Sequence, residues 1–261
     1  MSVWILNKKN VITILVVFAL SIGALTLSLN GLSALLDQDM PANTPENQRK
    51  LPVYSVETKQ KQVALTFNCA WGNEDIPALL EIFKRYDIKV TFFFVGTWVD
   101  KFPDSVRTII AAGHGVGNHS DKHPDMTKLA AAAIEKDIKS CNEKIAAITS
   151  TPPLYFRAPS GAYDNKTIEA AERLGMISVQ WDVDSIDWKD PAPDEIVTRV
   201  VSKVKNGSVV LFHAGKENTP KALPAIIEQL RNEGYSFVTV DELVLKENYT
   251  IDSTGRQHPK I

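Results

Sequence analysis

GNHSDKHP, residues 117–124, is the stretch from which we interpret the rest of the sequence. Its two histidines, His119 and His123, are four residues apart, and one helical turn would place residues at that spacing on the same face. Pro124 disfavours helix at His123, so the turn is predicted to end there. Because imidazole is a common ligand of zinc and similar ions, the pair is a candidate metal site. Two surface histidines in a polar loop are the alternative interpretation.

Short apolar runs alternate with amphipathic segments on both sides of this stretch. This alternation predicts an α/β protein with βαβ units and a parallel sheet. The number of units is small for a regular eight-fold barrel and suits a distorted (β/α)7 barrel. An open doubly wound sheet is the alternative, but no Gly-rich phosphate-binding sequence follows the first strand. The predicted strands are Val63–Asn68, Val90–Val95, Gly115–Asn118, Leu154–Arg157, Ile177–Asp182, Val209–His213 and Phe237–Val240. The predicted helical segments are Ile76–Tyr86, Pro103–Ala112, Lys128–Thr149, Asn165–Leu174, Pro193–Val204 and Lys221–Glu233.

Polar and reactive side chains stand at the ends of the predicted strands. In a barrel the C-terminal strand ends meet at one face, where active sites form. Three of the five histidines in the chain fall at this face, which scattered surface histidines would not be expected to do. The residues at these ends are Asn68, Cys69, His119, His123, Arg157, Asp182, Asp184, Asp187 and His213.

The N-terminal region carries a long apolar segment. No charged residue occurs between Asn10 and Leu36, and a helix over Val11–Leu29 would be about 28 Å long, enough to cross the hydrocarbon core. Lys8 and Lys9 precede the segment, so the N-terminus is predicted to be cytoplasmic and the rest outside. We expect a single-pass membrane anchor. A cleavable signal peptide is the alternative, disfavoured by the length of the apolar run and the lack of an A-x-A site.

The chain is thereby divided into four parts. We expect the cytoplasmic N-terminus and transmembrane anchor in 1–36, a linker in 37–60, the α/β domain in 61–246 and a tail in 247–261.

Composition excludes some partners and frameworks. The chain has 261 residues and a net charge of −2, without the basic excess of a nucleic-acid-binding protein. Its two cysteines, Cys69 and Cys141, are far apart and form no disulfide framework. We predict that they are not bonded to each other, since one ends a strand at the proposed site and the other lies in an outer helix.

Five short motifs, in this order along the sequence, resemble the polysaccharide deacetylase family, carbohydrate esterases with the chitooligosaccharide deacetylase homology domain. The resemblance covers about Val63 to Leu245 and is nearest to the membrane-anchored, sporulation-type members of Gram-positive bacteria. The motifs are Thr66-Phe67-Asn68-Cys69 at the family's T-F-D-D, His119-Ser120-Asp121-Lys122-His123 at H-[ST]-x-x-H, Arg157-Ala158-Pro159-Ser160-Gly161 at R-x-P-x-G, Asp184-Ser185-Ile186-Asp187-Trp188 at D-x-x-D-W, and Leu211-Phe212-His213 at L-x-H.

The resemblance implies a metal-dependent hydrolase that removes N-acetyl groups from cell-wall or spore-wall polysaccharide. It implies a divalent metal, expected to be zinc, on His119 and His123, with Cys69 at the position of the third ligand. His213 would protonate the leaving amine, and Asp187 or Asp184 would hold its ring. Arg157 would orient the catalytic carboxylate. The residues expected to contact the substrate are Trp188, Leu211, Pro159 and Gly161.

One departure from the family pattern affects catalysis directly. Asn68 stands where the family has its general base, and an amide cannot take up a proton at neutral pH. Glu74 or Asp75, which follow closely, would have to replace it. Two functions therefore remain: an active deacetylase, or a weak or inactive anchored homologue that still binds glycan. A purely structural membrane protein would leave the converging histidines unexplained.

Overall fold

The computed structural model describes residues 49–260, and the predicted anchor Val11–Leu29 lies outside them. Among the helices of this range, none combines the length and the apolar character needed to cross a membrane.

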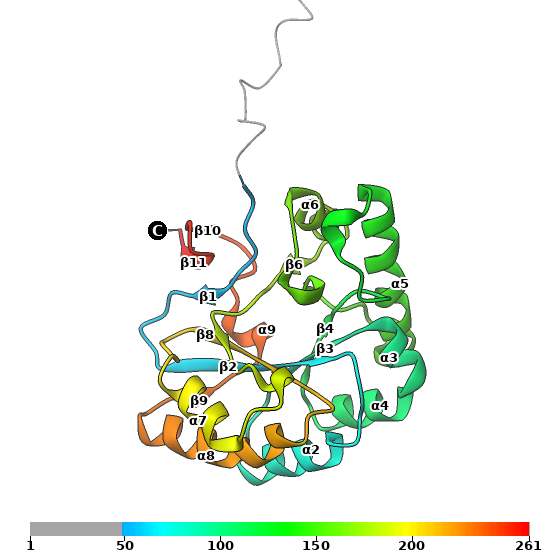
Figure 1. The fold of residues 1–261 in the computed structure, drawn as a ribbon. Helices are drawn as coiled ribbons and strands as arrows, with labels where there is room; N and C mark the ends of the chain where they lie inside the picture. The colour runs from blue at the N-terminus through cyan, green and yellow to red at the C-terminus, as the bar shows by residue number, and fades with distance from the viewer. Residues whose placement is uncertain (1–48, 261) are drawn as a thin grey trace, which may run out of the picture. The chain divides into compact units, whose positions relative to one another are not determined.

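A parallel sheet forms the centre of the domain (Figure 1). Its hydrogen-bonded order is β8-β2-β3-β4-β5-β6, with β7 added beside β8 and β9 beside β2. The sheet curls into a half-barrel, which confirms the α/β class and agrees with a distorted barrel. The strands are β2 (Gln62–Cys69), β3 (Thr91–Phe94), β4 (Gly115–Asn118), β5 (Tyr155–Phe156), β6 (Ile177–Ser178), β7 (Val183–Asp184), β8 (Ser208–His213) and β9 (Ser236–Phe237).

The segment before β2 connects the two sides of the curl. Val53 forms a parallel bridge with Val179, just after β6, while β1 (Ser55–Val56) pairs antiparallel with β8. A C-terminal hairpin, β10 (Tyr249–Ile251) and β11 (Arg256–Pro259), then extends the sheet, with β11 parallel to β1. The predicted linker 37–60 and tail 247–261 were thus wrong in part, because both contribute strands to the domain.

The outer layer consists of helices packed on the convex face of the sheet, whereas the short helix Val240–Leu243 packs into the inner cluster with Ala64 and Phe93. All six predicted helices are present, although α5 begins three residues later than predicted and α8 three residues earlier. The segment Phe237–Val240 is not one strand, because a capping box between Thr239 and Glu242 starts helix α9 there. The helices are α2 (Ile76–Arg85), α3 (Gly96–Lys101), α4 (Pro103–Ala111), α5 (Ala131–Thr149), α6 (Asn165–Arg173), α7 (Pro193–Val201), α8 (Asn218–Asn232) and α9 (Val240–Leu243).

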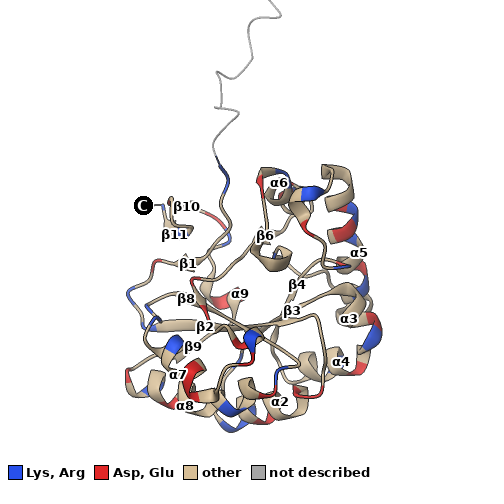
Figure 2. Cartoon of the chain, viewed as in Figure 1, with Lys and Arg blue, Asp and Glu red and all other residues tan. Residues whose placement is uncertain are grey.

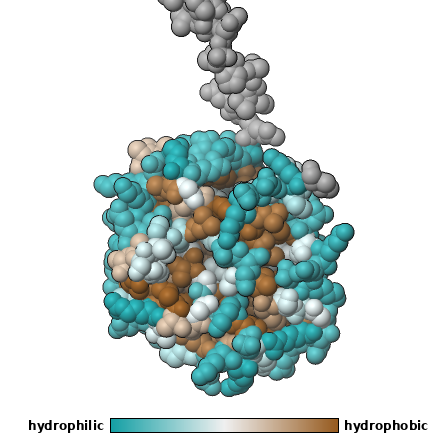
Figure 3. Space-filling model, turned by 180° about the vertical axis from the view of Figure 1, so that it is seen from behind, coloured by the Kyte–Doolittle hydropathy of each residue, from teal (hydrophilic) through white to brown (hydrophobic). Residues whose placement is uncertain are grey.

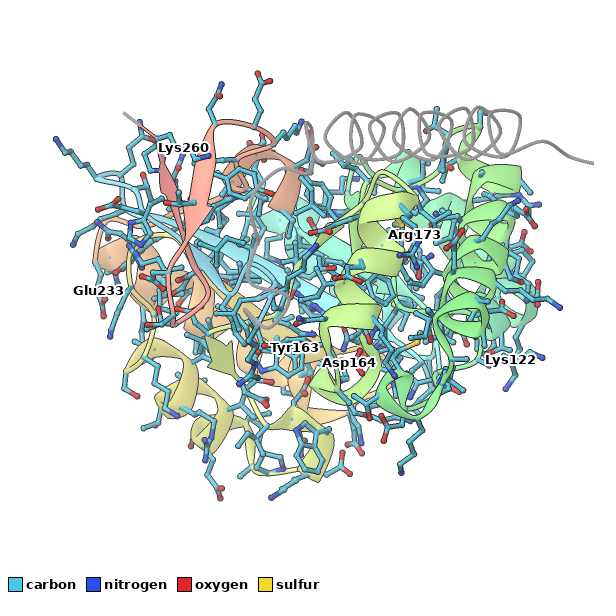
Figure 4. The ribbon with its side chains drawn as sticks, turned by 90° about the horizontal axis from the view of Figure 1, so that it is seen from above. Lys122, Tyr163, Asp164, Arg173, Glu233 and Lys260 are labelled. Atoms are coloured by element: carbon cyan, nitrogen blue, oxygen red, sulfur yellow. The ribbon has the colours of Figure 1, made fainter. Side chains whose placement is uncertain are left out.

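The exposed faces of these helices carry both signs of charge in alternation (Figure 2). The opposite side of the domain is hydrophilic at its margin, with smaller hydrophobic areas between (Figure 3). In the view from above, Asp164 and Arg173 mark the two ends of α6, and Lys260 follows the C-terminal hairpin (Figure 4). Mixed charge of this kind is typical of a solvated helical surface.

Strand β2 separates the two cores because its side chains alternate between faces. Phe67 points to the helical layer, where its ring packs against Phe83, Phe92 and Phe212 at centroid distances of 5.2–5.4 Å. Ala64 points to the inner face and joins a smaller cluster that includes Phe93. The same alternation sends Asn68 to the concave face, where the candidate site lies.

Both cysteines are buried and free, as predicted. The Cys141 thiol of α5 donates to the carbonyl oxygen of Phe94 at 3.3 Å. Cys69 belongs to the outer apolar core, together with Phe67 and Phe94. Each thiol therefore has its own place in the packing.

Candidate active site

A cavity of about 350 Å³ opens at the C-terminal ends of the central strands. It brings together three of the chain's five histidines, as the sequence predicted. Its walls come from the C-terminal ends of β2, β7 and β8 and from the loops after β2, β4, β5, β6 and β7. The lining residues are Asn68, Ala70, Trp71, His119, His123, Ser160, Trp181, Asp184, Trp188, Leu211 and His213.

The loop that carries His119 and His123 is not helical, so the predicted helical turn was wrong. Ser120 and His123 have left-handed backbones, with φ of 71° and 56°. Side chains supply the local hydrogen bonds instead: Asn118 Oδ1 accepts from the Ser120 amide at 2.6 Å, and Ser120 Oγ accepts from the His123 amide at 2.9 Å. The two imidazole rings nevertheless meet, with centroids 5.0 Å apart and planes at 80°.

Both imidazoles are set up as neutral bases. His119 Nδ1 donates to the carbonyl oxygen of Arg157 at 2.8 Å, which leaves the lone pair on Nε2. Burial lowers the pKa of His119 well below its usual range, and the neighbouring His123 lowers it further. Burial also lowers the pKa of His123. Both rings are therefore uncharged at neutral pH, the form in which imidazole binds metals.

The remainder of a three-ligand metal site is missing. Within residues 49–260, no group of three or more His, Cys, Asp or Glu side chains is gathered closely enough to hold a metal ion. Cys69 faces away from the cavity into the apolar core, and burial raises the pKa of its thiol well above the usual range. The predicted role of Cys69 as a metal ligand was wrong, because neighbouring strand residues point to opposite faces. The two imidazoles suit a divalent ion but fall one protein ligand short of the usual catalytic set.

Beneath the cavity lies Arg157, whose side chain is fully buried. Its Nη1 donates to Asn68 Oδ1 at 3.0 Å and to Thr66 Oγ1 at 2.9 Å, while Nε and Nη2 donate to two backbone carbonyls. The guanidinium lies 4.0 Å from the centroid of the Phe93 ring. All of these acceptors are neutral, and among the described residues no carboxylate pairs with it. Burial lowers the pKa of Arg157 to about 9, so it stays charged at neutral pH.

At the opposite wall, His213 and Asp187 form a buried, hydrogen-bonded imidazole–carboxylate pair. His213 Nδ1 lies 2.7 Å from Asp187 Oδ1, and Asp187 Oδ2 accepts from the His213 amide and from Thr219 Oγ1. These bonds hold the imidazole so that Nε2 remains for the cavity. The structure thereby selects Asp187 over Asp184 as the residue that holds the ring. Asp184 lines the cavity and accepts from the Ile186 amide at 2.8 Å.

Of the four residues expected to contact the substrate, two line the cavity and two do not. Trp188 and Leu211 line the cavity, but Ser160 does so in place of Pro159 and Gly161. Gly161 has a left-handed φ of 68° and packs near the Trp181 ring, which explains the glycine.

Glu74 and Asp75, the possible substitute bases, line a separate depression. Asp75 is engaged there, because its carboxylate accepts from the amides of Gly215 and Lys216. The sequence reasoning missed Trp71 and Trp181, which also line the cavity. Trp71 follows the first long strand by two residues, and that position is the signal that could have found it.

Comparison with known proteins identifies the family. The model of the family "Polysaccharide deacetylase" matches residues 55–179. The peptidoglycan-N-acetylmuramic acid deacetylase PdaA of Bacillus subtilis is 30% identical over 204 residues, which cover 77% of this chain and 78% of PdaA. The chain therefore belongs to the polysaccharide deacetylase family.

Two other proteins are similar to this chain, and for one of them a mutant structure is also similar. YlxY of Bacillus subtilis is 37% identical over 79% of this chain, which spans 65% of that protein's length. BA3943 of Bacillus anthracis, a CE4 family pseudoenzyme, superposes with a TM-score of 0.73 at 35% identity, over 84% of this chain and 76% of the other. A mutant of BA3943 with restored enzymatic activity is similar to the same degree, with a TM-score of 0.73 at 36% identity.

Arg157→Lys tests how far the site depends on the buried guanidinium. A lysine cannot supply donors to all four of the acceptors that Arg157 serves, so buried oxygens lose their partners. We expect the free energy of unfolding, measured by urea denaturation, to fall by about 3 kcal/mol. Arg107→Lys is the control, because Arg107 makes an exposed pair with Asp104. Equal stabilities for the two variants would contradict the central role given to Arg157.

Proposed function

We propose that this protein is a deacetylase of N-acetylated cell-wall glycan, such as peptidoglycan, whose rate is limited by Asn68. The observation that carries the proposal is the convergence of the His213–Asp187 pair with two neutral imidazoles in one cavity. Membership of the family and the likeness to PdaA support the choice of substrate.

The residues present divide the chemistry of amide hydrolysis among them. His213, held by Asp187, is placed to give a proton to the departing amine. Arg157 holds the side chain of Asn68 at the edge of the cavity, where it can orient a water molecule or the substrate. A divalent ion on His119 and His123, expected to be zinc, would lower the pKa of a bound water and polarise the acetyl carbonyl. The step that lacks a group is removal of a proton from the attacking water.

A second function is favoured by that missing group. The only carboxylate that lines the described cavity is Asp184, the last residue of β7. BA3943, a pseudoenzyme, is 35% identical to this chain. A weak or inactive homologue that binds glycan without turning it over is therefore the alternative, and rate measurements separate the two.

Replacing Asn68 by aspartate supplies the missing base. Arg157 Nη1 lies 3.0 Å from Asn68 Oδ1, an oxygen that the aspartate would keep, and the guanidinium would lower the pKa of the new carboxyl, keeping it ionised at neutral pH. We expect Asn68→Asp to raise the deacetylation rate on peptidoglycan and on chitooligosaccharide, with metal added, by a factor on the order of 10². Asn206→Asp, on the surface, is the control for the added charge.

Two results of that assay would count against the proposal. If the wild type already turns over well and Asn68→Asp changes little, another residue acts as the base, with Asp184 the first candidate. If both proteins are inert while glycan still binds, the protein belongs to the binding class.

The metal proposal has its own measurement. We expect purified full-length protein, incubated with zinc and desalted, to retain metal through the paired imidazoles of His119 and His123. His119→Ala removes one of the two ligands, so the bound zinc should fall by about tenfold or more, as loss of a ligand does. His258→Ala is the control, since His258 lies in the C-terminal hairpin between Glu57 and Asp252. Equal zinc content in the two variants would refute the site.

We also propose that Val11–Leu29 anchors the protein in the cell membrane with the domain outside. The uncharged segment and the preceding Lys8 and Lys9 support this orientation. Protease added to intact protoplasts should then digest the domain and leave a cytoplasmic marker protein intact. A domain that stays protected until the membrane is lysed would show the topology to be wrong, and a shortened N-terminus by mass spectrometry would indicate a cleaved signal peptide.

A further inference from the structure

Large apolar side chains are rarely exposed in this domain, and the exceptions are grouped. Within residues 49–260, the exposed large hydrophobic residues are Trp71 at 48%, Trp188 at 43% and Leu154 at 37%. Trp71 and Trp188 both line the candidate active site, whereas Leu154 lines a separate depression with Pro152 and Pro153. Two exposed indoles at the rim of one cavity indicate a surface kept for a ligand.

Lys216 connects the two tryptophans, which come from different loops. Its ammonium lies 4.9 Å from the centroid of the Trp71 ring. It also donates to the carbonyl oxygen of Trp188 at 3.2 Å and pairs with Asp190 at 3.1 Å. The Lys216 side chain is only 16% exposed, whereas that of its partner Asp190 is 65% exposed. One cation thereby fixes the distance between the loop after β2 and the loop after β7.

The backbone beneath Lys216 is itself held firmly. Asp75 accepts from the amides of Gly215 at 2.8 Å and of Lys216 at 3.3 Å. Gly215 has a φ of 79°, and a Cβ on it would lie 2.7 Å from the nitrogen of Gly72, so only glycine fits this contact. Trp98 Nε1 donates to the Gly72 carbonyl at 3.0 Å and anchors the same loop from the core side. The lysine therefore projects from a rigid base.

The chemistry of the rim selects the kind of ligand. The charge of Lys216 is already met by Asp190 and a carbonyl, so this lysine serves to hold the rim rather than to bind an anion. The Lys189 ammonium lies 4.8 Å from the centroid of the Trp188 ring. Indole faces bind the C–H faces of sugar rings, which are apolar although the ring edges are polar. Trp188 is the wall that the family resemblance already implies. We propose that Trp71 is the second aromatic wall of this glycan-binding cleft, and that Lys216 is the positioning residue that holds the two walls in place. The proposal rests on the proposed function and adds that binding does not require the base at position 68.

Calorimetric titration of chitotetraose into the full-length protein tests the inference. Trp71→Ala removes a wall and should weaken binding by about tenfold, and Lys216→Met, which keeps the aliphatic stem, by about fivefold. Lys216→Arg restores a cation able to stack on Trp71 and to pair with Asp190, so its affinity should return to within about twofold of the wild type. Leu154→Ala and Lys139→Met are the matched controls, each away from the cleft, and should bind as the wild type does.

The outcomes separate this inference from the proposed function. The positioning role of Lys216 alone is overturned if Lys216→Met binds chitotetraose with the affinity of the wild type. It is also overturned if Lys216→Arg binds as weakly as Lys216→Met. Leu154→Ala weakening binding as much as Trp71→Ala overturns the cleft. Absence of binding by the wild type, together with absence of turnover by Asn68→Asp, overturns both proposals.

Discussion

A positive charge buried without a negative partner is the constraint on which the site depends. The guanidinium of Arg157 is enclosed, and its acceptors in the described structure are a hydroxyl, an amide and two carbonyls. Removing a charge from water is costly unless hydrogen bonds and polarisable neighbours replace the water. The Phe93 face supplies part of that replacement at 4.0 Å. Gly117 makes room for it, since a Cβ there would lie 2.4 Å from the Phe93 ring.

The same residue couples the two halves of the site. The carbonyl of Arg157 accepts from His119 Nδ1, while its side chain donates to Asn68 Oδ1. Arg157, which directly follows the short strand β5, therefore fixes both the orientation of the His119 imidazole and the position of the Asn68 amide. This explains why a fully buried arginine, a costly residue, stands at the end of a strand that contributes only two residues to the sheet.

The sequence predicted those features that depend on periodicity and failed on those that depend on local hydrogen bonds. Strand ends and helices followed from apolar spacing, so the meeting of His119, His123 and His213 was predicted correctly. Alternation along β2 would also have separated Asn68 from Cys69, because adjacent residues face opposite sides. The irregular loop at His119 was not predictable from spacing, because Asn118 and Ser120 replace the helical bonds. The C-terminal hairpin was missed because its strands are short and polar, and they are stabilised by pairing with each other and with the distant strand β1.

The catalytic and binding parts of the cavity are held by different bonds. Asn68 is fixed by Arg157, whereas Lys216 is fixed by Asp75, Asp190 and the Trp188 carbonyl. The exchange of a carboxylate for an amide at position 68 therefore removes a proton acceptor and leaves the aromatic rim and the His213–Asp187 pair in place. Under the proposals made above, the protein can lose most of its catalytic rate and still bind glycan, because none of the hydrogen bonds that hold Lys216 involves the side chain of Asn68.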